Sequence, residues 1–117
     1  MKPNAHGVYS DRLAEKRCYR TKKATVTIFV LRVGRRWISA YHHTHHIGSL
    51  HGSGKPLTLR ESFTSREEAL SDAIKSVVGI NQEVLKPNGR GCGCVTPAQR
   101  VEAKRIIAWA EAQEAGR

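Results

Sequence analysis

The amino-acid sequence predicts a small α+β domain, in which a three-stranded antiparallel sheet packs against two helices on one of its faces. Two neighbouring segments rich in β-branched and aromatic residues indicate strands, and two later segments with apolar residues at helical spacing indicate helices. A length of 117 residues fits one domain with a modest core. Because the strands precede the helices, an α+β arrangement is expected.

The first two strands are predicted on either side of a tight turn. Residues 24–33 and 36–46 have strand composition, and Gly34-Arg35 separates them. Side chains alternate along a strand, so Ile38 and Ala40 share one face. The opposite face of the second strand is polar and aromatic, with Trp37, Ser39, Tyr41, His43 and His45.

A third strand is predicted over residues 57–63, after a Gly/Ser-rich loop at 48–56. Leu57, Leu59 and Phe63 would share one face of it, and Thr58 and Arg60 the other. With the two earlier strands it would complete the sheet.

The first helix is predicted over residues 65–78. Thr64-Ser-Arg-Glu67 fits a capping box, in which the Thr hydroxyl and the Glu carboxylate accept hydrogen bonds from free backbone N–H groups. Apolar residues then recur at helical spacing, and Gly79 is the expected stop. These residues are Leu70, Ala73, Ile74 and Val77.

The second helix is predicted over residues 97–112, after a Gly- and Cys-containing loop at 86–95. Thr96 is the expected cap, Pro97 suits the first turn, and Gln99 completes a second capping box. Its apolar stripe consists of Ala103, Ile106, Ile107 and Ala110.

Positive charge is concentrated at the start of the chain. Residues 1–36 contain ten Lys/Arg and two acids, a net of +8, whereas residues 37–117 add only +2 to the total of +10. Residues 1–23 are predicted to form a basic arm or short helix (a helix over 10–20), ahead of a single domain at 24–117. A polyanion is the expected partner, because Lys and Arg that neutralise phosphates release condensed counterions.

A nucleic-acid interface is therefore predicted on the arm, the first hairpin and the polar sheet face. Lysines and arginines of the arm would contact the phosphate backbone, and the hairpin with the sheet face would contact grooves or bases. The first group is Lys16, Arg17, Arg20, Lys22 and Lys23. The second group is Arg32, Arg35, Arg36, Trp37, Tyr41, His43 and Arg60.

Residues 24–79 resemble the three-strand-plus-helix module of AP2-like DNA-binding domains, which also occurs as the arm-type binding domain of phage integrases. The resemblance rests on Arg36-Trp37-Ile-Ser-Ala-Tyr41 and on Phe63-Thr-Ser-Arg-Glu-Glu-Ala-Leu70. It implies a sheet that docks in a DNA groove and a helix that braces its back. The order of elements also resembles a double-stranded-RNA-binding domain.

A histidine cluster at residues 42–46 raises the alternative of a zinc site. Imidazoles two residues apart on a strand share a face; His51 lies nearby in the sequence, and Cys92 and Cys94 are the thiols that would complete such a site. The spacing matches none of the common zinc signatures, so we predict no metal and no cofactor. A polar strand end, or one that gains positive charge near pH 6, is the simpler interpretation.

The sequence thus predicts a non-catalytic, cytoplasmic nucleic-acid-binding protein, with DNA favoured. No nucleophile motif of known spacing is present, and the longest apolar run is far too short to cross a bilayer. Three cysteines without a secretion signal favour reduced thiols. One alternative stays open, a phage- or plasmid-type inhibitor that occludes a host nucleoprotein machine such as a CRISPR effector or a nuclease.

Overall fold

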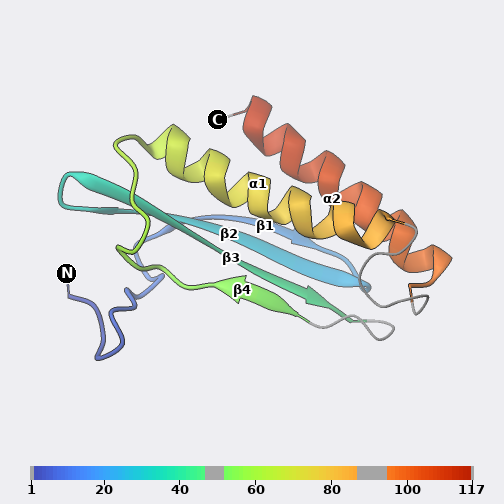
Figure 1. Cartoon of the computed structure of the whole chain (residues 1–117), viewed down its shortest axis with the longest axis horizontal. Coiled ribbons are helices and arrows are strands. Elements are labelled where there is room, and N and C mark those ends of the chain that lie inside the picture. Colours follow the sequence, from blue (N-terminus) through green and yellow to red (C-terminus); the bar gives the residue numbers. More distant parts are fainter. Residues whose placement is uncertain (1, 47–51, 87–94, 117) are drawn as a thin grey trace.

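Two helices lie on one side of a four-stranded sheet in the computed structural model, which describes residues 2–46, 52–86 and 95–116 (Figure 1). The α+β class with both helices on one face is confirmed, but the sheet has four strands and not the three that were expected. In chain order the elements are β1 (Glu15–Arg20), β2 (Ala24–Val33), β3 (Arg36–His45), β4 (Ser53–Lys55), α1 (Arg66–Leu85) and α2 (Pro97–Ala115).

The sheet has the order β1-β2-β3-β4, and every neighbouring pair is antiparallel. The β2–β3 hairpin pairs along its whole length, from Ala24 opposite His45 to Val33 opposite Arg36. Gly34 begins its turn with a φ of 61°, a conformation that glycine adopts without steric penalty. The hairpin predicted at this point is confirmed.

The arm or helix expected over residues 10–20 is wrong, because residues 15–20 form β1 and pair with β2 from Glu15 to Arg20. The side chains of β1 alternate between half-buried and exposed, which is the period of a strand. Pairing with the long strand β2 decides the conformation here, and the thin apolar stripe along a helix could not compete with it.

The third strand expected over residues 57–63 is also wrong. The fourth strand of the sheet, β4, lies earlier in the chain, and Phe63 makes only an isolated bridge to Trp37. Leu57 instead accepts a hydrogen bond from the backbone N–H of Tyr9 at 2.8 Å and is buried beside it. The apolar residues that indicated a strand therefore anchor a loop to the N-terminal segment.

Helix α1 is longer than predicted and begins one residue later. Ser65 is its N-cap and accepts from the N–H of Glu68, so the cap is not Thr64. The helix also runs past Gly79, because Asn81 and Val84 extend its buried stripe. In α2 the capping box of Thr96 and Gln99 is confirmed.

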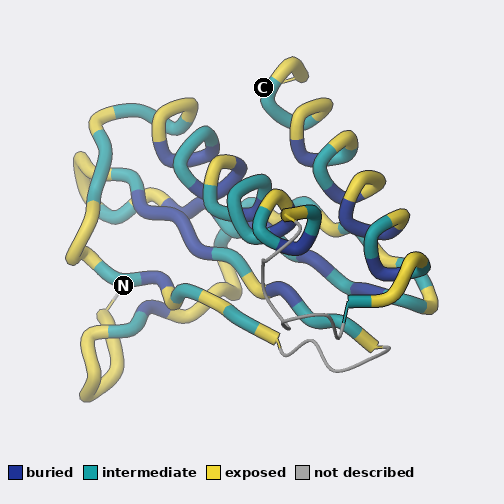
Figure 2. Tube along the Cα trace, turned by 45° about the vertical axis from the view of Figure 1, so that its right-hand side comes forward, coloured by how far each residue is buried: buried dark blue, intermediate teal, exposed yellow. Residues whose placement is uncertain are grey.

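The main core lies between the sheet and the helices, and a smaller apolar cluster lies on the opposite face. Figure 2 shows buried stretches along the central strands and recurring along both helices. The main core includes Val26, Ile28, Val30, Leu70 and Ile106. The smaller cluster is formed by Tyr9, Leu31, Ile38, Ala40 and Leu57.

The sheet face that was expected to be open is the one that the helices cover. The register places Tyr41 opposite Ile28 and His43 opposite Val26, so the polar set of β3 shares its face with the apolar stripe of β2. His43 is only 1% exposed, and its Nε2 lies 3.0 Å from the Asn81 amide nitrogen of α1. The stripe on β2 provides the larger apolar area, and the helices pack against it.

Candidate nucleic-acid interface

The face of the sheet that points away from the helices, here called the outer face, presents rows of side chains across β1, β2 and β3. In register, Lys16 lies beside Phe29 and Ala40, and Arg20 lies beside Thr25 and Thr44. Between them, the middle row consists of Cys18, Thr27, His42 and Gly54. Lys16, Cys18, Arg20 and His42 are exposed.

Hydroxyl and imidazole groups dominate the middle of this face. Thr27 donates to the sulfur of Cys18 at 3.7 Å, and the Thr44 hydroxyl lies 3.5 Å from His42 Nδ1. The Thr25 hydroxyl lies 2.8 Å from His46 Nε2. Such groups can donate to or accept from phosphates and base edges.

The charge of the sheet is almost entirely positive. Residues 15–46 contain eight Lys/Arg and one acid, Glu15, whereas the two helices contain five Lys/Arg and seven acids. Glu15 points toward the helix layer, where it binds Arg66. The three described strands β1, β2 and β3 therefore place no carboxylate on the outer face.

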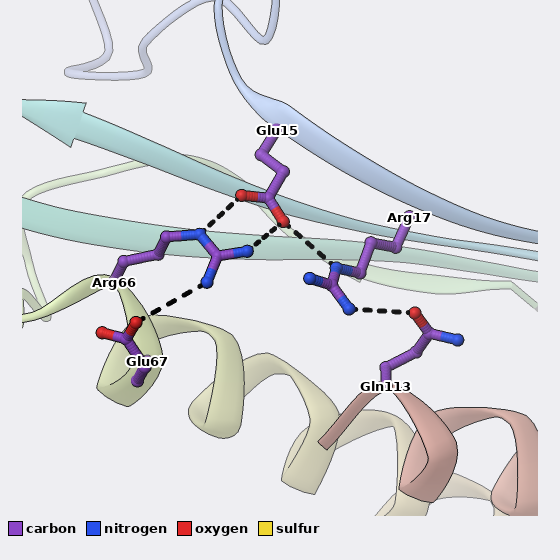
Figure 3. Close-up of polar contacts among 5 residues, drawn as sticks. All are labelled: Glu15, Arg17, Arg66, Glu67 and Gln113. Carbon is purple, nitrogen blue, oxygen red and sulfur yellow. Dashed lines mark hydrogen bonds and ion pairs between the residues drawn. The ribbon is translucent and has the colours of Figure 1, made fainter. Parts of the chain in front are cut away.

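Figure 3 shows the contacts that attach β1 to both helices. Arg66 of α1 donates through two nitrogens to the two oxygens of Glu15, each at 2.7 Å. Arg17 donates to Glu15 at 3.1 Å and to Gln113 of α2 at 3.1 Å. The hydrogen bonds from Arg66 and Arg17, opposed by partial burial, hold the pKa of Glu15 below its ordinary value.

Arg17 was predicted to contact phosphate, but it lies on the helix side of β1 and its guanidinium is held by Glu15 and Gln113. Strand alternation separates it from its neighbours, because Lys16 and Arg20 point to the outer face. The structure therefore keeps Lys16 and Arg20 together and removes Arg17 from the surface that they form.

The turn between β1 and β2 is held in place by a buried carboxylate of the helix layer. Glu102 of α2 is 1% exposed and accepts hydrogen bonds from the hydroxyls of Tyr19 and Thr21, the latter at 2.7 Å. Thr21 in turn accepts from the backbone N–H groups of Lys23 and Ala24, at 3.1 and 3.2 Å. This chain of bonds sets the conformation of the turn that carries Lys22 and Lys23.

The same contacts shift two pKa values. Burial, followed by the hydrogen bond to Glu102, raises the pKa of Tyr19 to about 12. Burial alone would raise the pKa of Glu102, but the hydrogen bonds from Tyr19 and Thr21, together with the positive charges of Arg105 and Lys23, outweigh it and leave the pKa below its ordinary value. Glu102 is therefore a carboxylate at neutral pH, close to a cationic turn.

The three arginines at the other hairpin lie at the opposite end of β2, about 30 Å from the β1–β2 turn at the usual rise per residue. Arg36 donates to the hydroxyl of Ser62 at 2.9 Å and to its carbonyl at 3.1 Å, and Arg32 donates to the carbonyl of Gly34. Arg35 is exposed in the turn itself. These cations form a group separate from Lys16, Arg20, Lys22 and Lys23.

The expectation that Trp37, Tyr41 and His43 form an open binding face is wrong. Trp37 and Tyr41 pack against the main core, and His43 is covered by α1. Arg60 is exposed but lies in a turn after β4, beside the N-terminal segment, and not on a strand. Sequence reasoning missed Thr25, Thr27 and His42, although the alternation opposite the apolar stripe of β2 could have indicated them.

The histidine cluster does not form a metal site within the described ranges, where no three His, Cys, Asp or Glu side chains are grouped as ligands. His43 and His45 contact each other with ring centroids 4.6 Å apart. His51, Cys92 and Cys94 lie outside the described residues. Neither described helix has the length and apolar character needed to cross a membrane.

No protein-family model, no curated protein and no solved structure matches this chain.

Proposed function

We propose that the protein binds nucleic acid, with DNA favoured, through the outer face and the β1–β2 turn. The observation that carries the proposal is a sheet surface with exposed cations and no carboxylate of its own. A polyphosphate backbone complements this surface, and each phosphate that a Lys or Arg neutralises releases counterions.

The dimensions of the surface support a duplex as the ligand. Three neighbouring strands spaced about 4.8 Å apart give an outer face about 10 Å across from β1 to β3. The major groove of B-form DNA is about 12 Å wide and admits strands, whose side chains then meet base edges. Lys16 and Arg20 on the edge strand would contact phosphates, and Thr25, Thr27 and His42 would lie toward the groove floor.

The β1–β2 turn extends the same cationic surface. Lys22 is exposed, and Lys23 follows it within the turn that Thr21 holds in place. Neither lysine has an ion pair within 4.0 Å among the described residues. Both amines are thus available to phosphate, and neither must first leave a carboxylate.

The test compares two double variants that remove the same charge from different layers. Lys16→Ala with Arg20→Ala removes two exposed cations from the outer face. Lys75→Ala with Lys104→Ala removes two exposed cations from the helices. Binding of a 20-base-pair duplex is measured by fluorescence anisotropy over a range of salt concentrations.

We expect the outer-face variant to bind at least 10-fold more weakly and the magnitude of its salt slope to fall by about two, because each phosphate contact contributes about 0.9 to that slope. The helix variant is expected to stay within 3-fold of the wild type. Equal losses in the two variants would show that net charge alone drives association. No binding by the wild type at low salt would overturn the proposal.

A further inference from the structure

A hollow on the outer face lies beside the cationic row, and His42 is the one proposed duplex contact among the residues that line it. It has a volume of about 470 Å³, which is within the range of ligand pockets. Phe29, Ala40 and His42 form its floor on the sheet, with Gly54 next to His42. The segments 8–11 and 54–57 contribute its two walls.

The hollow exists because small residues stand between large ones. Ala40 lies in register with Phe29, and Gly54 lies opposite His42, so neither position fills the space above the sheet. A Cβ added at Gly54 would approach the Tyr41 carbonyl oxygen to 3.1 Å, which shows how closely β4 lies against β3 here. The floor is thus largely apolar, with one aromatic ring and one imidazole.

Two cations flank the hollow. Lys16 lies beside Phe29 in the register of β1 and β2 and points to the same face. On the other side, Arg60 lines a neighbouring hollow that shares Val8, Lys55 and Pro56 with this one. A nucleic-acid backbone that passes across this part of the face would meet a cation before and after the hollow.

The Asp11 carboxylate is a hydrogen-bond acceptor at the hollow that has no cation bound to it among the described residues. Asp11 is exposed, and its carboxylate has no ion pair among the described residues. The amine of Lys55, in contrast, is already bound to Glu61 at 3.0 Å and to Asp72 at 3.5 Å. A carboxylate only accepts hydrogen bonds, so it selects a ligand edge that donates them.

We propose that this hollow binds a single unpaired nucleobase, guanine best, from a nucleic acid held on the outer face; the inference rests on the proposed function. An aromatic floor stacks with a base, and two walls admit one base but not the edge of a base pair. Guanine offers the adjacent N1–H and N2 amine as two parallel donors to the Asp11 carboxylate. Phosphates on either side of the base lie toward Lys16 and Arg60.

The experiment uses three labelled 20-base-pair DNA duplexes that differ only at the centre, which is fully paired, carries one unpaired guanine, or carries one unpaired thymine. Their affinities for the full chain are measured by anisotropy at one salt concentration. The test variant is Asp11→Asn, at an exposed position whose carboxylate makes no ion pair among the described residues, and the matched control is Glu111→Gln, which makes the same charge change on α2. Phe29→Leu keeps the floor apolar and removes its ring.

We expect the wild type and Glu111→Gln to bind the guanine bulge about 10-fold more tightly than the paired duplex and the thymine bulge. Asp11→Asn should bind the paired duplex no more weakly than the wild type does and lose the preference for guanine over thymine. Phe29→Leu should weaken binding of both bulges several-fold. Paired-duplex binding without a guanine preference, or a preference kept in Asp11→Asn, would overturn this inference and leave the proposed function standing. No binding of any duplex would remove both.

Discussion

The two faces of one sheet differ in what covers them. The inner face carries aromatic and polar side chains, such as Trp37, Tyr41 and His43, yet the helices cover it, and His43 contacts Asn81 of α1. The outer face carries fewer aromatic rings but keeps Lys16 and Arg20 exposed, and its strands β1, β2 and β3 place no carboxylate on it. A surface for a polyanion is thus indicated by charge left uncancelled after packing, and not by the residue types on a strand.

The largest effect expected from this comparison is on stability. Ile28→Ala, on the inner face at 0% exposure, should lower the free energy of unfolding by about 3 kcal/mol, because it leaves a cavity in the main core. Thr27→Ala, its neighbour on the outer face, should change that free energy by about 0.5 kcal/mol or less. Urea unfolding of both variants checks the difference. Similar losses in the two would mean that the side chain of Thr27 is packed as closely as that of Ile28.

The fold class, the hairpin and the α2 cap could be predicted because their signals are local. The turn at Gly34 and the capping box at Thr96 need only neighbouring residues. In contrast, β1 and the loop at Leu57 depend on partners distant in sequence, namely β2 and Tyr9. Local propensity carries no information about such partners.

Parts of the candidate site could also be predicted, and the error in the rest has a specific cause. Lys16, Arg20, Lys22 and Lys23 were identified from charge alone. The polar face of β3 was expected to be open because the register of β3 on β2 was not taken into account. The short turn pairs Leu31 with Ile38, and this register places the polar side chains of β3 on the same face as the apolar stripe of β2. The helices then cover the face with the larger apolar area, which is the face that carries the stripe on β2.

A smaller stability effect is expected at the buried carboxylate. Glu102→Leu removes the carboxylate that accepts hydrogen bonds from the hydroxyls of Tyr19 and Thr21. Because both hydroxyls then lack this acceptor, the free energy of unfolding should fall by about 2 kcal/mol. The β1–β2 turn should loosen as well, so amide hydrogen exchange at Lys23 and Ala24 should accelerate. Unchanged exchange there would contradict the role of Glu102 in holding the turn. Ala108→Leu, at an exposed position of α2, is the matched control.

A still smaller effect is expected on the pH dependence of stability, through the contact between Glu15 of β1 and Arg66 of α1. Because the pKa of Glu15 is lowered in the folded state, its contact with Arg66 stabilises the protein above the ordinary value of 4.5 and is lost as the pH falls through the lowered pKa. Glu15→Gln should therefore lower the free energy of unfolding by about 1 kcal/mol at pH 7 and show a shallower decline below pH 4.5. Thermal unfolding from pH 3 to 7 measures this. If the stability of Glu15→Gln declines as steeply below pH 4.5 as that of the wild type, other carboxylates cause the decline.

Whether the outer face binds nucleic acid is tested most directly by an amide NMR titration of the full chain with a 20-base-pair duplex at low salt. We expect the largest shifts on the outer-face strands and the β1–β2 turn, at Lys16, Arg20, Lys22, Thr25 and Thr27. Exposed positions of the helices, such as Lys75 and Lys104, should move little. Shifts concentrated on α1 and α2, with the outer face unmoved, would contradict this expectation.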